Sequence, residues 1–351
     1  MKTRGLTIDE TAKVKGVACI LLIIHHLFNS NYTFKTLLTT GKWNYMDNFV
    51  SFAKVCVILF LVISGYGLSE QFERKNIRMI KSVVKFVYNH IIKLYLTFWV
   101  IYLIFVPMGI FFGHSFAITY EGSIKNMLLD FFALSYLLNT PMANRTWWYI
   151  SVMLIYYILF PFAFYIIKRF KSASVVLFIG MAGGAYIFVG KRLWYIYFIP
   201  FLFGMILSRY DFFSRIDNLW KTKTGGDRFK IVIYLAALLI YSVIRTIYLN
   251  DRMFYYVFDW VFALIIILII RDVKWPDWLS KVLSSLGTHS GNIFMFHTFF
   301  FSIYMTRYVY WPEYAGVIFF TFLGGCVLVS ILLEKFKAVS RYNRLYQILR
   351  I

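Results

Sequence analysis

The sequence predicts an all-α membrane protein with about ten transmembrane helices, both termini cytoplasmic and no appended soluble domain. Of its 351 residues, 60% are hydrophobic and only 15% are charged, and the mean hydropathy is +0.68. A soluble domain does not need that much apolar surface. The apolar residues fall into runs that can cross a hydrocarbon core of about 30 Å as helices. The basic residues gather in alternate connecting segments.

Ten apolar segments account for the predicted spans. The first has a basic flank like a signal peptide, but no small-residue cleavage site follows it, so we expect it to be retained. The sixth is short and the third begins as a basic amphipathic segment, which leaves nine or eleven spans as alternatives. The spans are expected at 14–30, 48–68, 88–112, 147–167, 173–190, 194–208, 229–248, 254–270, 288–307 and 314–334.

The distribution of Lys and Arg predicts the orientation. Of the 37 basic residues, 27 lie toward the side on which an even number of spans places the termini, and 9 lie toward the opposite side. Such a bias marks the cytoplasmic side, so both termini are expected inside, in a single transmembrane domain covering residues 1–351. The bias also explains the net charge of +21 without nucleic acid, which is not an expected partner.

Ionisable residues inside the predicted spans are informative, because each costs a few kcal/mol unless it is paired or lines a wet cavity. Lys54, Arg245 and Asp259 fall in the outer third of their spans, where ion pairing or snorkelling explains them. The remaining ones are the neighbours His25 and His26 in the first span and a late histidine, His297.

The first span joins a cation at its start to a histidine near its middle. Lys15 and His26 are eleven residues apart, which corresponds to a rise of roughly 16 Å and to nearly the same face of an α-helix. His25 points about 100° away from that face. A neutral imidazole accepts a proton near neutral pH, so the shared face favours His26 as a base over a structural role.

Two further motifs lie at the predicted cytoplasmic ends of spans. Phe60–Leu68 places Ser64 among small residues, which suits either close helix packing or a free hydroxyl. The basic run that includes Lys85 and Lys93 leads into Tyr95. This run fits contact with anionic lipids or a clamp for phosphate groups, and the sequence leaves both readings open.

Tandem tryptophans begin the fourth span. Trp147 and Trp148 fit an aromatic belt at the outer interface, or an aromatic floor on which a sugar stacks. His297, by contrast, lies about ten residues into the ninth span, near the expected depth of His26.

Together these motifs resemble the acyltransferase-3 family of integral-membrane O-acyltransferases, of the type that acetylates surface polysaccharides. The first helix of that family opens with Arg/Lys-Gly and carries a histidine eleven residues after the cation, as at Lys15 and His26. The other similar stretches, in order, are Phe60–Tyr66, Lys93-Leu94-Tyr95, Trp148-Tyr149-Ile150 and Gly287–His297. The chain departs from the family pattern at Leu61 for a phenylalanine, Leu96 for a proline and Lys93 for an arginine.

The resemblance implies ten spans in a bacterial plasma membrane and transfer of an acyl group, usually acetyl, from cytoplasmic acyl-CoA. The acceptor would be a hydroxyl of an extracytoplasmic surface polysaccharide or lipid-linked sugar. Acetyl-CoA would be a donor substrate rather than a permanent cofactor, and no metal is expected. Other expected partners are the bilayer and, as one open oligomeric state, a second copy in a homodimer.

The resulting site prediction assigns three roles. The catalytic residues are His26 as general base, Ser64 and His297; the donor-binding residues are Lys15, Lys85, Lys93 and Tyr95; the acceptor-binding residues are Trp147 and Trp148. An alternative function is a transporter or flippase of lipid-linked sugars without acyl transfer, since it would also use many spans, buried polar groups and aromatic floors.

Overall fold

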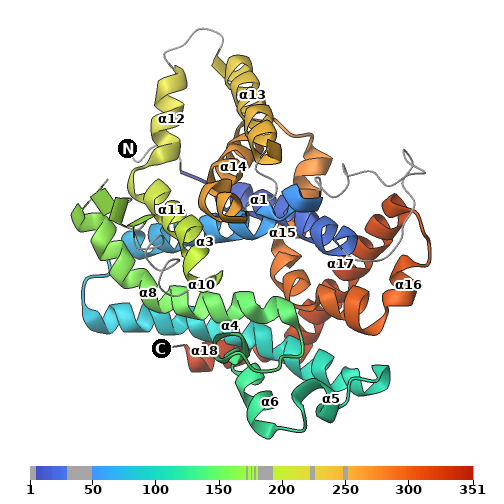
Figure 1. Cartoon of the computed structure of the whole chain (residues 1–351). Helices are drawn as coiled ribbons and strands as arrows, with labels where there is room; N and C mark the ends of the chain where they lie inside the picture. The colour runs from blue at the N-terminus through green and yellow to red at the C-terminus, as the bar shows by residue number, and fades with distance from the viewer. Residues whose placement is uncertain are drawn as a thin grey trace. The chain divides into compact units, whose positions relative to one another are not determined.

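A computed structural model describes residues 5–29, 50–170, 173–174, 176–177, 179–180, 193–221, 226–247 and 252–350. These ranges form helices joined by short connections (Figure 1). The all-α class predicted from the sequence is therefore confirmed for the part of the chain that the structure describes.

Six helices in the described ranges are long and apolar enough to cross a membrane. They overlap six of the ten predicted spans, so the chain is a multi-pass membrane protein. The predicted number of ten and the location of the termini remain predictions. The six run over Ile8–Phe28, Val50–Arg74, Ile80–Phe112, Arg145–Phe170, Phe229–Ile247 and Ala315–Val339.

The other four predicted spans do not coincide with any of these six helices. Most of 173–190 lies outside the described residues. The stretch 194–208 forms two short helices, α10 (Leu193–Ile196) and α11 (Phe198–Arg209). The stretch 254–270 lies within α14 (Arg252–Asp272), and 288–307 is divided between the end of α15 (Asp277–Thr298), a π-helical turn and the start of α16 (Thr306–Tyr310).

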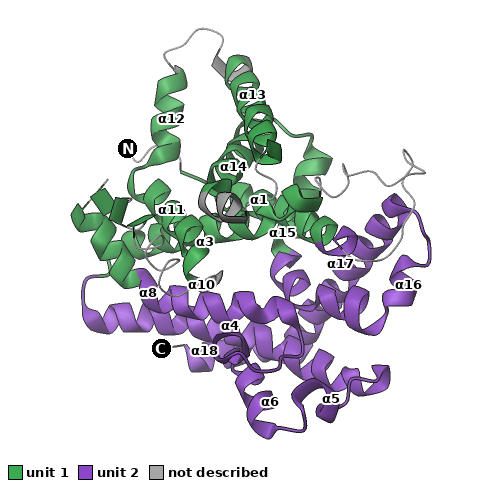
Figure 2. Cartoon of the chain, viewed as in Figure 1, with its two compact units in different colours: residues 1–25, 44–77, 161–288 green, residues 26–43, 78–160, 289–351 purple. Residues whose placement is uncertain are grey.

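The chain forms two compact units that interleave along the sequence (Figure 2). Unit 1 comprises residues 1–25, 44–77 and 161–288, and unit 2 comprises 26–43, 78–160 and 289–351. The prediction of one domain over the whole chain remains a prediction.

In unit 1, α3 (Val55–Arg74) packs on α11 through two glycines. A Cβ built on Gly65 would overlap the carbonyl oxygen of Phe201, and one built on Gly204 would overlap that of Val62. Only glycine lets two backbones approach this closely. The small residues of Phe60–Leu68 therefore serve helix packing at Gly65.

A second pair of glycines joins α1 (Ile8–Phe28) to α15 in unit 1. A Cβ at Gly16 would overlap the carbonyl of Leu283, and one at Gly287 would overlap that of Ala12. Gly16 and Gly287 belong to the two motifs that carry the family resemblance at Lys15 and His297. His26 lies ten residues after Gly16, and His297 ten residues after Gly287.

Unit 1 also contains the predicted intramembrane charges. Arg245 on α13 (Gly226–Ile247) is fully buried, and its guanidinium donates to both carboxylate oxygens of Asp259 on α14, at 2.9 and 3.0 Å. The Tyr241 hydroxyl donates to the same carboxylate at 3.2 Å. The prediction of ion pairing is therefore confirmed for Arg245 and Asp259. A buried ion pair needs additional hydrogen bonds, such as the one from Tyr241, to offset the cost of desolvation.

In unit 2, the segment after α4 (Ile80–Met108) folds back along that helix. The 3₁₀ turn η1 (Gly109–Phe112) is followed by α5 (Phe116–Tyr120), α6 (Ile124–Phe131) and α7 (Ser135–Leu138). Carbonyl groups of this segment accept hydrogen bonds from three α4 side chains, with Met127 bonded to Tyr102, Phe131 to Trp99 and Phe132 to Tyr95.

The remaining helices of unit 2 supply the site. They are the first part of α8 (Trp148–Phe170), which follows η2 (Arg145–Trp147), the end of α15, the π-helical turn η3 (Phe299–Tyr304), α16, α17 (Ala315–Val339) and α18 (Tyr342–Leu349).

The glycine contact of α3 gives a paired test. Gly65→Ala should prevent close packing on α11 and lower the yield of folded, monodisperse protein in detergent. Gly67→Ala, two residues along the same helix, should fold as well as wild type, because nothing lies within 4 Å of its Cβ position. Equal yields for the two variants, measured by size exclusion, would show that the Gly65 contact does not hold α3 against α11.

Candidate active site

Two histidines from distant parts of the sequence meet in unit 2. The His26 ring, near the end of α1, lies 4.9 Å from the His297 ring, near the end of α15, measured between centroids. The Phe301 ring lies 6.0 Å from each of them. His26 is half-buried, whereas His297 is fully buried. The structure therefore brings together two of the three predicted catalytic residues.

Hydrogen bonds to the backbone fix the tautomer of His297. Its Nδ1 lies 2.9 Å from the carbonyl of Ile293 and 3.0 Å from that of Phe294. A carbonyl accepts only, so the proton of the neutral ring is on Nδ1. Nε2 then carries a lone pair, and it is buried without a hydrogen-bond partner among the described residues. A lone pair held this way is ready to accept a proton or a hydrogen bond.

His25 has a different partner. Its Nδ1 lies 2.9 Å from the carbonyl of Val50 in unit 1. This agrees with the helix-face argument, which separated His25 from His26 by about 100°.

The backbone of His297 is held from outside its own helix. Directly after Thr298 the chain changes from α- to π-helical pairing, and such a change leaves backbone groups at the junction available to other donors. The Met295 carbonyl accepts from the Trp147 indole N–H at 2.9 Å and from the Asn144 amide at 3.4 Å. Single-turn π-helices are frequent at functional sites.

Asn144 is the centre of a buried polar network. It is 1% exposed, and its side-chain oxygen accepts from the hydroxyls of Thr146 and Thr298, both at 2.7 Å, and from the Thr146 N–H at 3.0 Å. The amide thus holds the residue that follows His297 as well as the carbonyl two residues before it.

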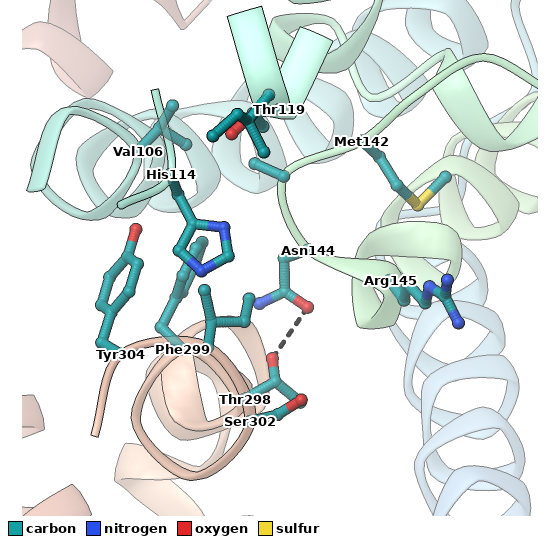
Figure 3. Close-up of a pocket in the computed structure, with 13 residues that line it drawn as sticks. Val106, His114, Thr119, Met142, Asn144, Arg145, Thr298, Phe299, Ser302 and Tyr304 are labelled. Atoms are coloured by element: carbon teal, nitrogen blue, oxygen red, sulfur yellow. Dashed lines mark hydrogen bonds between the residues drawn. The ribbon is translucent and has the colours of Figure 1, made fainter. Parts of the chain in front are cut away.

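A cavity of about 310 Å³ adjoins this network. Figure 3 shows Asn144 bonded to Thr298, with the His114 ring near Asn144 and Tyr304. Arg145 adds a positive charge to the cavity lining. Thr119 and Ser302 contribute further hydroxyl groups to the lining of the cavity. The cavity therefore offers hydrogen-bond donors and acceptors one residue away from His297.

A buried carboxyl group holds the loop on this side of the cavity. Asp130 on α6 is 1% exposed, and it accepts from the Tyr120 hydroxyl at 2.8 Å and from the Ala143 N–H at 2.9 Å. Burial raises the pKa of Asp130 to about 7, although both hydrogen bonds oppose the shift. Burial and the neighbouring Asp130 raise the pKa of Tyr120, so its hydroxyl stays a neutral donor.

The predicted donor-binding residues divide between the units. Lys85 and Lys93 are exposed on α4 in unit 2. Tyr95, on the same helix, donates its hydroxyl to the Phe132 carbonyl at 2.9 Å and stacks on Trp99. Lys15 and the third predicted catalytic residue, Ser64, are half-buried in unit 1.

The tandem tryptophans occupy different environments. Trp147 is 2% exposed and packs against Phe98, Tyr102 and Phe299. A ring enclosed in this way has no face for a sugar, so its function in the structure is to donate to the Met295 carbonyl. Trp148 is half-buried beside Tyr136.

Sequence reasoning missed Asn144, Thr298, His114 and Asp130. Weak signals exist for two of them: Asn144 begins a polar run, Asn144-Arg145-Thr146, directly before the tryptophans, and Asp130 is a single aspartate within the apolar stretch Met127–Leu138. Within the described ranges, no group of three His, Cys, Asp or Glu side chains could hold a metal ion. The expectation that the protein needs no metal remains a prediction.

The fold and the site define a helical, multi-pass membrane protein with a contacting pair of histidines, His26 and His297, and a polar cavity lined by Thr298, the residue after His297. The chain belongs to the acyltransferase-3 family, whose model, described as an acyltransferase domain, matches residues 14–334. It is therefore a membrane acyltransferase, as the motifs predicted. No curated protein and no solved structure matches the chain.

The raised pKa of Asp130 predicts a pH-dependent difference in stability. The folded protein retains a proton that an unfolded carboxyl releases, so the stabilisation is complete below about pH 4 and is lost as the pH rises to about 7. The unfolding temperature of wild type in detergent should therefore fall relative to that of Asp130→Asn between about pH 5 and about pH 8.

The matched control is Glu121→Gln, which changes an exposed carboxylate in the same segment. The unfolding temperature of Glu121→Gln should differ from that of wild type by the same amount at every pH. If the difference in unfolding temperature between wild type and Asp130→Asn does not change with pH, it would contradict the burial of an ionisable group at this position.

Proposed function

We propose that this protein transfers an acetyl group from cytoplasmic acetyl-CoA, or a related acyl group from acyl-CoA, to a hydroxyl of an extracytoplasmic glycan or lipid-linked sugar in a bacterial plasma membrane. His26 acts as the general base. The observation that carries the proposal is the contact of His26 with His297, whose tautomer is fixed and whose Nε2 lone pair has no hydrogen-bond partner among the described residues.

His26 is the better candidate for the base because it is half-buried, whereas His297 is enclosed. The acceptor hydroxyl attacks the thioester carbonyl while His26 takes its proton; the carbon–sulfur bond then breaks, and the proton passes to the leaving thiolate. Transfer through an acyl-imidazole on His26 is an alternative with the same overall balance.

His297 supports this step by stabilising the charged form of its neighbour. When His26 gains a proton, a small rotation of the ring allows a donated hydrogen bond to the Nε2 of His297. That bond is absent before the reaction and forms as charge develops, which lowers the barrier rather than tightening ground-state binding.

For the donor, the exposed ammonium groups of Lys85 and Lys93 are suited to the phosphates of CoA. Tyr95 is omitted from the proposed donor site because its hydroxyl is bonded to Phe132. Lys15 and Ser64 remain sequence predictions. The polar cavity next to Thr298 is the proposed acceptor site, with Asn144 and His114 in its lining, and takes the place of the predicted tryptophan floor.

A transporter or flippase is the second candidate, and the membership of the family argues against it. The two functions differ in one measurable property, since a transporter of lipid-linked sugars has no need to bind CoA. Calorimetry of CoA with the detergent-purified protein separates them.

The adjacent histidines provide the test of the chemistry. Acyl transfer by purified His26→Ala protein should fall roughly 10²–10⁴-fold, the usual cost of a lost general base, while CoA affinity stays near that of wild type. His25→Ala is the matched control. It should retain substantial activity, because the His25 ring bonds to the Val50 carbonyl and takes no part in the proton transfer. Inactive His25→Ala protein alongside normal turnover by His26→Ala would contradict the proposal.

A further inference from the structure

We infer that the acceptor is amphiphilic, with a hydroxyl-bearing, anionic headgroup in the polar cavity and a hydrocarbon chain in an apolar groove beside it. This inference rests on the proposed function and selects a lipid-linked acceptor over a polysaccharide without a lipid. It comes from a second cavity in unit 2, of about 480 Å³, which shares Val106, His114 and Thr119 with the polar cavity.

The two cavities differ in the chemistry of their walls. The polar cavity is lined by Asn144, Arg145 and Ser302 among others. The groove is lined mainly by apolar side chains from α4, η1, α5 and α6: Leu103, Pro107, Ile110, Phe116, Leu128 and Phe131. A ligand that fills both needs a polar end and an apolar end.

The position of the groove indicates a chain that lies within the membrane. Leu103 and Ile110 belong to the candidate span Ile80–Phe112, and they are 61% and 67% exposed. Exposed apolar side chains of a spanning helix face hydrocarbon, so the groove is open to a chain arriving from the bilayer. Leu128, on the opposite wall, is also exposed.

His114 lies at the junction of the cavities because of a tight turn after α4. Its N–H donates to the Gly109 carbonyl at 2.8 Å, and Gly113 has a positive φ of 80° that favours glycine. A Cβ at Gly109 would crowd both His114 and the Tyr304 hydroxyl. This turn brings α5 back along α4, so that one imidazole borders both cavities.

The charge of the polar end follows from Arg145. A guanidinium in the lining of a cavity favours a phosphate or carboxylate, which it can bind with two parallel hydrogen bonds. Arg145 lines the polar cavity and not the apolar groove, so the anionic group belongs to the polar end of the ligand, as a phosphate on a sugar headgroup would.

The test uses a polyprenyl phosphate that carries a photoreactive diazirine on its chain, added to wild-type protein in phosphatidylcholine nanodiscs. Mass spectrometry should locate the crosslinks in the peptides around Leu103–Ile110 and Met127–Phe131. Unlabelled polyprenyl phosphate should compete, and the same concentration of phosphatidylglycerol should not. Arg145→Gln should lower the apparent affinity about tenfold or more, the value of a lost charge-assisted bond.

Matched variants test whether the hydrocarbon chain of the ligand lies in the groove. Leu128→Trp fills the groove and should remove most of the labelling, whereas Leu328→Trp, on an exposed face of α17, should leave it unchanged. Ile110→Trp fills the groove from the η1 side and gives an independent variant if Leu128→Trp misfolds. Labelling spread equally over α17, or equal competition by phosphatidylglycerol, would overturn the inference and assign the groove to ordinary bilayer lipid.

The labelling does not depend on turnover, so His26→Ala protein should label like wild type. Correct labelling with full activity in His26→Ala would refute the proposed base and leave the amphiphilic acceptor standing. If His26→Ala loses activity and the groove is not labelled, the result would support the proposed base and refute the amphiphilic acceptor.

Discussion

The candidate active site depends on how the backbone around His297 is held. In a regular α-helix each carbonyl bonds within its own helix, but the change to π-helical pairing after Thr298 makes room for donors from elsewhere. Trp147 and Asn144 bond to the Met295 carbonyl, and Asn144 also accepts from Thr298. Residues on both sides of His297 are thereby fixed to the segment that begins α8, which lets a fully buried ring keep one orientation beside His26.

This arrangement gives each polar group near the histidines a defined function. The two backbone carbonyls at His297 Nδ1 set its tautomer, and Asp130 holds the Ala143 N–H next to Asn144. Buried polar groups of this kind cost free energy unless they are satisfied. A site whose groups are already oriented needs little rearrangement during the reaction, and such preorganisation is a major source of catalytic stabilisation.

Much of this could be predicted from the sequence, and the limits have physical causes. Periodicity and hydropathy located six of the spans, and helix geometry separated His26 from His25, because both depend on local spacing. The pairing of His26 with His297 was only suggested by similar depth. The functions of Trp147 and Asn144 were not predictable, because they depend on a π-helical turn and on contacts between residues about 150 positions apart. The tandem tryptophans suggested a surface, whereas Trp147 is enclosed by aromatic rings.

The central claim is that His26 and His297 act as one unit. A double-mutant cycle on kcat/KM, using His26→Ala, His297→Ala and the double variant in purified protein, tests it most directly. If His297 works only by stabilising protonated His26, the double variant should be no slower than His26→Ala alone, while all three retain CoA binding. Losses that multiply in the double variant would show that the two histidines act independently and would contradict the account.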